Sequence, residues 1–524
     1  MWLIIFHRFR WISRQLEALH GDGGIIHRIL KAPHELGTAL DEHLDKISEE
    51  KSQDAILLFK CLIAAFRPLR LREVAEIFAP QSNRDNTRYE MDMLSECRAL
   101  VDFDERKGAK VVQFSSPFVK EFLTSEHLKT SNYGNISRYY ITPGPEATPQ
   151  VAHTALSQVC ITVLLQLDED VDKIALRRFP LAFYAGSHWV DHTRLGNVSE
   201  NLEIMKKLFD PEKSHLDAWI WMYDIERGRR RTMDDLGPRP SPRSATALYY
   251  AALCGFSELV SYLVKERQED PMDTAKLGYH GTPLHAASYK GHLGVVRVLL
   301  ECGADVNDPA GDRTPLYAAY YGGQLEAMEL LLQHGANVNS PDAVNHTLLH
   351  RASRDGRRQA LALLLDYKAD INARNRNGWT PLHWAASRGH VEVTKRLLAG
   401  RAAVNSQSLN NNTPLYIASV IGNLEVVEVL LRSGANASIR GEHNWTSLEA
   451  ARKNGRDTVA DLLSSSSGDR IPLDRDKSAT EVRPMKRRAL LVGITYSNTS
   501  GKMWPQLYGP HDDVDRYREL LVSG

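Results

Sequence analysis

Two histidines that stand four residues apart, His188 and His192, could form one edge of a metal site. On a helix this spacing brings both imidazoles to the same face, and imidazole is a common zinc ligand. The sequence places no third ligand beside them and no HExxH motif around them. We therefore expect packing or surface histidines at these positions, and we predict no metal site.

Five cysteines are further candidates for chemistry. They are Cys61, Cys97, Cys160, Cys254 and Cys302. None belongs to a close CxxC pair, and an odd, scattered set is typical of reduced cysteines in the cytoplasm or nucleus. The first apolar run, residues 1–6, is too short for a membrane span or for the core of a secretory signal. We expect a cytoplasmic protein, with the nucleus as the alternative, and no membrane partner.

Charge and phosphate-binding motifs argue against two more classes of ligand. Lys and Arg together number 65, and so do Asp and Glu, so the chain has no net field that attracts nucleic acid. The basic run Arg227–Arg231 lies just before the Pro-rich segment 237–242, where we expect a solvated linker in preference to a nuclear import signal or a nucleic-acid contact. No GxxxxGKS or GxxxxGKT motif occurs, so we expect no ATP binding. We predict no nucleic-acid partner, no cofactor and no small-molecule substrate.

The element that must position any functional side chain in the second half of the chain is a repeat of about 33 residues. Seven segments align on a threonine, with Leu two residues later, Ala five, Gly nine and a second Leu seventeen residues later. The seven threonines are Thr246, Thr282, Thr314, Thr347, Thr380, Thr413 and Thr446. Such a period is typical of a helical solenoid, in which each unit buries its apolar face against its neighbours.

Each repeated residue type has a local structural role. Thr caps the start of a helix, Pro fits the first helical position, and the Gly ends that helix in a left-handed conformation. Two residues before the threonines stand residue types that tolerate the positive φ of a hairpin turn: His280, Asp312, Asn345, Gly378, Asn411 and Asn444. Lys368 and Arg401 stand where other repeats have glycine, so a left-handed backbone there is predicted to cost about 1 kcal/mol each.

The stretches GTPLH at residues 281–285 and GWTPLH at 378–383 resemble the signature of ankyrin repeats. The resemblance implies that residues 244–465 form seven ankyrin repeats, which bind a protein partner through hairpin tips and inner helices. Exposed Tyr, Trp and Arg are the types that anchor interfaces. The candidate partner-binding residues are therefore Tyr289, Lys290, Arg313, Tyr321, His346, Arg354, Arg376, Trp379, Arg388 and Trp445.

The first part of the chain combines helical and strand-like patterns. Helical apolar spacing at residues 54–66 and 67–78 precedes two strand-like runs, at 100–103 and 110–114. This order predicts a winged-helix domain over residues 51–135, with a DNA-reading role as a minor alternative that Arg67, Arg70 and Arg72 would serve.

A second resemblance covers about 230 residues at the start of the chain. Residues 9–11 (FRW) with 15–16, 66–69 (FRPL) with 73–76 (EVAE), and 115–124 resemble the winged-helix region that follows the NACHT module in fungal signalling ATPases of the STAND class. Residues 183–189 (FYAGSHW), with His192, resemble the helical region that comes next in the same proteins. By that resemblance, residues 1–50 form a helical segment like the tail of a NACHT module, 136–236 a helical region, and 237–243 a linker. The chain is then expected to begin where the nucleotide-binding module of that family ends.

The end of the chain resembles the start of another fold. A polar linker is expected at residues 466–485, followed by a strand-like run at 487–496 and a helical run that begins near Asp512 or Asp513. Residues 486–524 resemble the opening βα unit of caspase-like proteins, especially fungal metacaspases. No cysteine follows Cys302, so a His/Cys catalytic dyad is not expected in this chain.

These observations predict a mainly α protein: an ankyrin solenoid, preceded by a winged-helix (α+β) and helical region and followed by a short, truncated caspase-like α/β fragment. The predicted function is a non-catalytic recognition scaffold of a STAND-like intracellular sensor. The alternative is the regulatory, substrate-selecting part of a caspase-like cysteine protease whose dyad lies beyond Gly524.

Overall fold

The computed structural model describes most of residues 51–466. The described residues are 44, 47, 51–78, 94–95, 97, 100–106, 109–115, 119–120, 123–124, 150–167, 171–231, 233–237, 245–272, 277–309 and 313–466. The chain divides into two compact units, residues 1–469 and 470–524. The second unit, which holds the caspase-like prediction, lies outside the described residues, as does the NACHT-like tail apart from Leu44 and Ile47.

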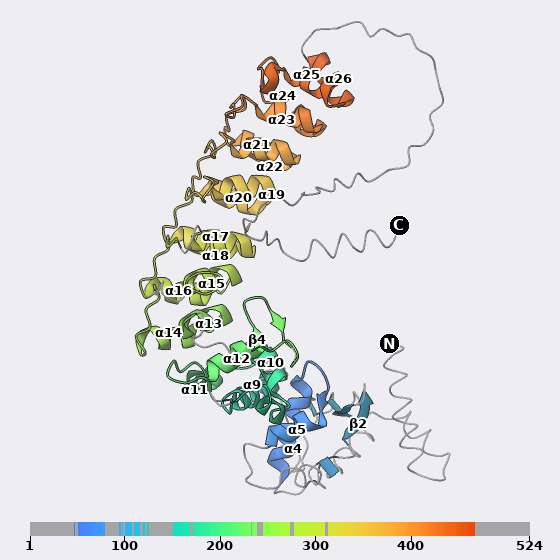
Figure 1. Cartoon of the computed structure of the whole chain (residues 1–524), viewed down its shortest axis with the longest axis vertical. Coiled ribbons are helices and arrows are strands. Elements are labelled where there is room, and N and C mark those ends of the chain that lie inside the picture. Colours follow the sequence, from blue (N-terminus) through green and yellow to red (C-terminus); the bar gives the residue numbers. More distant parts are fainter. Residues whose placement is uncertain are drawn as a thin grey trace, which may run out of the picture. The chain divides into compact units, whose positions relative to one another are not determined.

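Pairs of short helices succeed one another through the second half of the described chain (Figure 1). The seven pairs are α13 (Ala247–Cys254) with α14 (Ser257–Lys265), α15 (Pro283–Lys290) with α16 (Leu293–Glu301), α17 (Pro315–Gly322) with α18 (Leu325–Gln333), α19 (Leu348–Asp355) with α20 (Arg358–Asp366), α21 (Pro381–Arg388) with α22 (Val391–Ala399), α23 (Pro414–Ile421) with α24 (Leu424–Arg432), and α25 (Ser447–Lys453) with α26 (Asp457–Ser466). Second helices pack on second helices of the next pair, and first helices on first helices, except that α17 and α19 approach each other less closely than the other neighbouring first helices do. Each pair starts at one predicted threonine, so the pairs are numbered repeats 1 to 7.

The predicted local roles are confirmed at the ends of these helices. The hydroxyl of Thr314 accepts a hydrogen bond from the Tyr317 N–H, and Thr246, Thr413 and Thr446 cap their helices in the same way. The glycine nine residues after each threonine is left-handed, with φ between 66° and 96°. One turn prediction is wrong: His280 does not adopt positive φ, because Gly281 takes that conformation in the first hairpin.

Apolar side chains at fixed repeat positions fill the space between neighbouring pairs. The Ala five residues after each threonine and the Leu seventeen residues after it are at most 1% exposed in all seven repeats. The small Ala side chain lets first helices of adjacent repeats approach closely, and the Leu joins the two helices of one repeat. This packing makes the repeats one continuous hydrophobic core.

The row of helices continues upstream of repeat 1. Helix α11 (Val198–Leu208) packs on α14, as second helices of adjacent repeats do, and α10 (Ala182–Leu195) packs on α11. Trp189 of α10 lies 5.5 Å from Phe256, measured between ring centroids, and Arg194 donates two hydrogen bonds to the Cys254 carbonyl. These contacts cover the apolar face that repeat 1 would otherwise expose.

A small antiparallel sheet and two helices form the N-terminal part of the described chain. Its elements are α4 (Ser52–Ala64), β1 (Leu69–Arg70), α5 (Leu71–Phe78), β2 (Val101–Arg106) and β3 (Ala109–Phe114), with strand order β1-β3-β2. The predicted strands 100–103 and 110–114 are β2 and β3, whereas β1 was not predicted. Two residues are too few for a periodic signal, and β1 exists because Leu69 pairs with Val112 across the sheet.

Two helices and a hairpin connect this part to the repeats. Helix α9 (Gln150–Leu164) packs on both α4 and α10, and α12 (His215–Met222) precedes the hairpin of β4 (Tyr223–Asp224) and β5 (Arg229–Arg230). The basic run therefore does not form the expected linker: Arg229 pairs with Asp224 in the hairpin, and Arg231 donates to the Trp221 carbonyl. Within the described residues, no helix combines the length and hydrophobicity needed to span a bilayer.

Candidate protein-interaction surface

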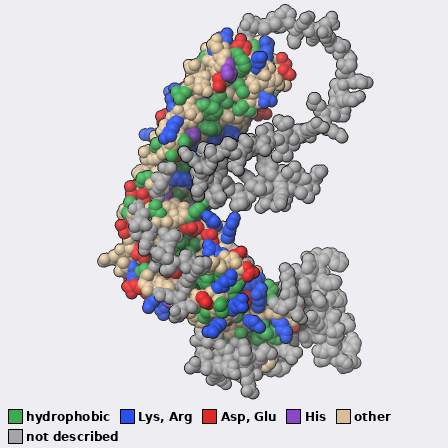
Figure 2. Space-filling model, in the orientation of Figure 1, with side chains coloured by type: hydrophobic (Ala, Val, Ile, Leu, Met, Phe, Trp, Pro, Cys, Tyr) green, Lys and Arg blue, Asp and Glu red, His purple; other side chains and the backbone are tan. Residues whose placement is uncertain are grey.

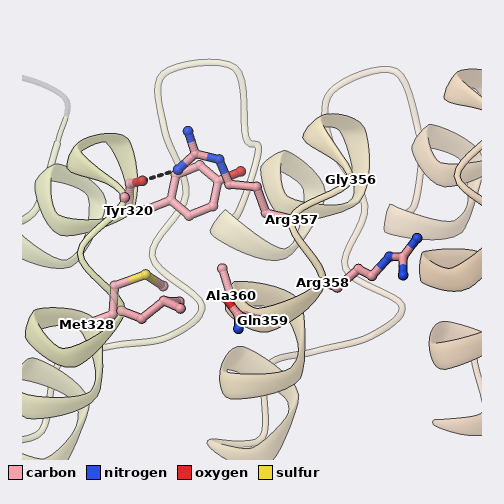
Figure 3. Close-up of a pocket in the computed structure, with 9 residues that line it drawn as sticks. Tyr320, Met328, Gly356, Arg357, Arg358, Gln359 and Ala360 are labelled. Carbon is pink, nitrogen blue, oxygen red and sulfur yellow. Dashed lines mark hydrogen bonds between the residues drawn. The ribbon is translucent and has the colours of Figure 1, made fainter. Parts of the chain in front are cut away.

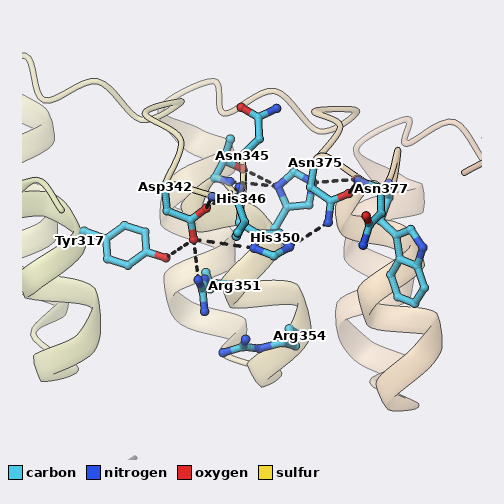
Figure 4. A network of polar contacts seen from close by, with 12 residues as sticks. Tyr317, Asp342, Asn345, His346, His350, Arg351, Arg354, Asn375 and Asn377 are labelled. Carbon is cyan, nitrogen blue, oxygen red and sulfur yellow. Dashed lines mark hydrogen bonds and ion pairs between the residues drawn. The ribbon is translucent and has the colours of Figure 1, made fainter. Parts of the chain in front are cut away.

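A row of aromatic and charged side chains runs across repeats 3, 4 and 5 (Figure 4). We call it the repeat 3–5 surface, and it consists of Arg313, Tyr317, Tyr321, Asp342, His346, Arg351, Trp379 and Trp384. The first helices α17, α19 and α21 carry four of these residues, and the hairpins before them carry the other four. Contacts between these residues link all eight of them, so the surface is continuous.

Repeat 3 supplies two tyrosines and an arginine. The Tyr317 and Tyr321 rings lie 5.2 Å apart, between centroids, as expected for side chains four residues apart on a helix. The Arg313 guanidinium lies 5.1 Å from the Tyr321 ring centroid, which is a cation–π distance. Arg313 is exposed and Tyr321 is half-buried, so both are accessible to a partner.

Asp342 joins repeat 3 to repeat 4. Its Oδ2 accepts hydrogen bonds from Arg351 at 2.5 Å and from the Tyr317 hydroxyl at 3.2 Å, while Oδ1 accepts from the backbone N–H of Val344 and of His346. Burial opposes ionisation of this carboxyl, but the hydrogen bonds from Arg351 and the backbone outweigh it, so the pKa of Asp342 is lowered. Burial raises the pKa of Tyr317, which therefore remains a hydroxyl donor at neutral pH.

His346 and two tryptophans extend the surface into repeat 5. The His346 ring lies 5.6 Å from the Trp384 ring, which lies 4.8 Å from the Trp379 ring, both between centroids. Asn375 holds this hairpin in place, since its side-chain amide lies 2.8 Å from His346 Nε2 and its Oδ1 accepts from the Trp379 N–H at 2.9 Å. The tryptophans thus form a partly exposed, preorganised apolar patch.

Buried histidines fix the hairpins that carry Arg313 and Trp379. The Nδ1 atoms of His285 and His350 each accept a hydrogen bond from the hydroxyl of the capping threonine three residues earlier. Nε2 of His285 donates to the Arg313 carbonyl at 2.7 Å, and Nε2 of His350 donates to the Trp379 carbonyl at 3.0 Å. A carbonyl can only accept, so Nε2 carries the proton. Burial lowers the pKa of His350 to about 4, which keeps the ring neutral for this role.

Four of the ten residues predicted from the sequence lie together on this surface: Arg313, Tyr321, His346 and Trp379. The other six lie elsewhere on the repeats. Tyr289 stacks on His280 at 4.2 Å between centroids with Lys290 beside it, Arg354 pairs with Asp355 at 2.8 Å, and Trp445 contacts His443 in the last hairpin. Arg376 and Arg388 are exposed, and the ion pairs of the described residues include neither.

Four residues of the surface were missed by sequence reasoning: Tyr317, Asp342, Arg351 and Trp384. The sequence held a signal for two of them. Arg351 and Trp384 each stand four residues after the capping threonine of their repeat. On a helix that position neighbours the one seven residues after the threonine, from which Tyr321 was predicted. Tyr317 and Asp342 carried no such signal, since their importance depends on a contact between two repeats.

The histidines considered for zinc lie far from this surface in the sequence. His192 Nδ1 lies 2.8 Å from His153 Nδ1, its Nε2 lies 3.0 Å from the Tyr184 hydroxyl, and its ring stacks on Phe66 at 4.4 Å between centroids. Burial lowers the pKa of His192 to about 3. Across the described ranges, no three His, Cys, Asp or Glu side chains form a group that could hold a metal ion.

The face drawn in Figure 2 carries basic and acidic side chains interspersed with apolar ones over the repeats. This mixture agrees with the neutral charge of the whole chain. The repeat 3–5 surface is a continuous group of side chains within this mixed charge distribution.

Comparisons with known proteins agree with the repeat architecture. The family model for ankyrin repeats (three copies) matches residues 198–310, 305–375, 349–441 and 382–473. A curated relative, the azaphilone pigments biosynthesis cluster protein L of Monascus ruber, is 30% identical over 299 residues, which cover 52% of this chain. The chain spans 60% of that relative's length. Because the family matches run from residue 198, at the start of α11, to residue 473, more than half of the 524 residues, this chain belongs to the ankyrin-repeat family.

Proposed function

We propose that this protein binds a protein partner through the repeat 3–5 surface, and that the partner presents an acidic segment with apolar side chains. The observation that carries the proposal is the unbroken series of contacts from Arg313 through Tyr321 and Asp342 to Trp384 and Trp379. Tyr, Trp and Arg dominate interface hot spots because they combine a large apolar area with directed hydrogen bonds.

The charges around the surface favour an acidic partner. Asp342 is neutralised by Arg351, and Asp355 by Arg354. Arg313 contacts only an aromatic ring among the side-chain contacts described for it, and Arg376 and Arg388, which belong to the same repeat as the tryptophans, are exposed. The excess charge is therefore positive, and carboxylates on the partner would complement it.

A comparison of surface variants tests this proposal. The full chain, immobilised, is offered cell extract of the source organism, and bound proteins are quantified for the wild type, for a Tyr321→Ala/Trp379→Ala double variant and for an Arg432→Ala control. Arg432 is exposed on the second helix of repeat 6 and pairs with Glu428. Loss of at least 90% of one partner in the double variant, with full retention in the control, supports the proposal, and equal retention in both contradicts it.

The sensor context is part of the proposal. The helix and strand order of residues 51–115, the sheet β1-β3-β2 and its packing through α4 on α9 are compatible with a winged-helix regulatory region of the STAND type. In such a protein, partner binding at the repeats would act on the regulatory region through the shared core of α9, α10 and repeat 1. We also propose a cytoplasmic location, without a nucleic-acid or small-molecule ligand.

Transcripts that extend through both ends of this reading frame test that context. A nucleotide-binding P-loop upstream supports the sensor proposal, and an upstream region without one contradicts it. A His/Cys dyad downstream would instead favour the alternative, a regulatory part of a caspase-like protease. This alternative rests on residues 486–524, which lie outside the described residues.

A further inference from the structure

A cavity of about 540 Å³ opens between repeats 3 and 4, at the loops that join first to second helices (Figure 3). Its walls are Tyr320, Leu325, Met328, Arg357, Arg358 and Ala360. These loops lie at the opposite ends of the first helices from the capping threonines and the hairpins. The cavity is thus separate from the repeat 3–5 surface.

The cavity exists because no side chain lies over Gly323, whereas a side chain of the next repeat lies over the equivalent glycine of most other repeats. In most repeats the residue before the second helix lies over the glycine of the preceding repeat: a Cβ on Gly255 would stand 2.7 Å from the His292 ring, and a Cβ on Gly356 would stand 2.8 Å from the His390 ring. A Cβ on Gly323 would meet nothing within 4 Å. The space above Gly323 is therefore open.

Arg357 occupies the position just before the second helix of repeat 4, which is equivalent to that of His292 and His390. Its guanidinium lies 4.5 Å from the centroid of the Tyr320 ring and donates a hydrogen bond to the Tyr320 carbonyl (Figure 3). His292 and His390 occupy the same position in repeats 2 and 5. Their Nε2 atoms lie 3.1 Å from the Leu253 carbonyl oxygen and 2.9 Å from the Arg354 carbonyl oxygen, each one residue later in its repeat than Tyr320. The Arg357 side chain therefore does not lie over Gly323.

The chemistry of the walls defines the occupant. Leu325, Met328 and Ala360 give the cavity an apolar interior, while Arg357 places a positive charge at its edge. The ion pairs of the described residues include neither Arg357 nor Arg358, and Arg358 is exposed. An apolar group next to a carboxylate complements this arrangement, because the carboxylate can receive the free N–H groups of Arg357.

We propose that this cavity is a second docking site, which receives an aromatic or aliphatic side chain from an acidic segment of a protein partner. The site is independent of the repeat 3–5 surface and engages a partner from the loop side of the repeats. The Arg357 guanidinium would pair with a carboxylate adjacent to the inserted side chain, so that apolar fit and charge are both required.

Short peptides and methyl spectroscopy on the full chain test this proposal. The ten methionines are labelled with ¹³C at the methyl group, and the Met328 signal is assigned with a Met328→Leu variant. The probes are the peptides Ac-EDFDE-NH₂, Ac-EDADE-NH₂ and Ac-KKFKK-NH₂, together with 2-naphthoate. The expected result is a saturable Met328 shift with Ac-EDFDE-NH₂ and binding at least tenfold weaker with the two other peptides.

Two variants complete the test. Arg357→His introduces the residue type that repeats 2 and 5 have at this position, where His292 and His390 lie over the glycine of the preceding repeat. The variant should therefore fold, fill the cavity and weaken Ac-EDFDE-NH₂ binding at least tenfold. Tyr321→Ala/Trp379→Ala, which tests the repeat 3–5 surface, should leave the Met328 response unchanged.

Four results would overturn the proposal: no Met328 shift at millimolar peptide, equal binding of Ac-KKFKK-NH₂, full binding by Arg357→His, or a shift that only 2-naphthoate produces, which would identify a small-molecule site.

Discussion

The carboxylate of Asp342 and the guanidinium of Arg351 lie 2.5 Å apart, and both side chains are largely buried, with 8% and 19% of their areas exposed. The two residues belong to repeat 4, but the same carboxylate oxygen also accepts from Tyr317 of repeat 3. A single ion pair thus joins two repeats and orders the centre of the repeat 3–5 surface.

We predict that Arg351→Met destabilises the protein by about 2 kcal/mol, because it leaves the Asp342 carboxylate buried without its cation. A double-mutant cycle with Asp342→Asn should give a coupling free energy of about 1–2 kcal/mol in urea unfolding. The matched control is Asp366 with Arg396, which lie 4.0 Å apart and are 70% and 56% exposed. Their coupling should stay below about 0.5 kcal/mol, and equal coupling in both cycles would refute the role of burial.

Buried histidines predict a loss of stability in mild acid. Burial lowers the pKa of His350 and His383 to about 4 from an ordinary value of 6.5. Between pH 6.5 and pH 4 the unfolded chain binds protons that the folded chain does not, so the free energy of unfolding falls as pH falls through this range. Each histidine should contribute up to about 2 kcal/mol of that loss between pH 6.5 and pH 5.

His383→Gln should therefore lower stability at pH 7.5 but flatten the decline between pH 6.5 and pH 5. Urea titrations at half-unit pH steps measure this slope. The control is Gly335→Ala, which changes no titratable group and should displace the whole curve without altering its slope. A His383→Gln curve parallel to the wild type would show that this ring does not carry the pH dependence.

Two residues other than glycine that have a left-handed backbone conformation offer a route to higher stability. Lys368 and Arg401 have φ of 62° and 67°, where repeats 2, 3 and 6 have glycine. Replacing either by Gly removes a steric cost of about 1–2 kcal/mol but adds about 0.5–1 kcal/mol of backbone entropy, so we expect a net gain of about 0.5 kcal/mol each.

The reverse substitution, Gly335→Ala, should cost about 1 kcal/mol. Gly335 has φ of 87°, and a Cβ there would meet no atom within 4 Å, so the cost comes from backbone conformation alone. Thermal unfolding of the three variants measures both effects. Destabilisation by Lys368→Gly would mean that the lysine side chain contributes more than its backbone costs.

A buried carboxyl in the N-terminal part predicts the opposite pH dependence. Burial raises the pKa of Glu76 to about 7 from 4.5, against a hydrogen bond from the Leu181 N–H, whose nitrogen lies 2.5 Å from Oε2. The unfolded carboxyl loses its proton first as pH rises, so stability is lost between pH 4.5 and pH 7. Glu76→Gln should therefore stabilise by about 2 kcal/mol at pH 8 and change little at pH 4.5. A constant effect across this range would contradict the pKa shift.

The sequence alone predicted the seven threonines at which the helix pairs start and the glycines that end their first helices. Thr at the helix start and Gly at its end act through hydrogen bonds and backbone conformations that span only a few residues, so a linear pattern reveals them. The same pattern placed Arg313, Tyr321, His346 and Trp379 on the accessible face of the repeats.

Tertiary structure decided how these local units combine. The bond from Tyr317 to Asp342, the pairing of Leu69 with Val112 and the orientation of Arg357 away from Gly323 each depend on which side chains meet across repeats or strands. Repeats of identical pattern place different side chains at these meeting points. Their packing, which depends on the shape and charge of both partners at once, therefore could not be predicted from the period.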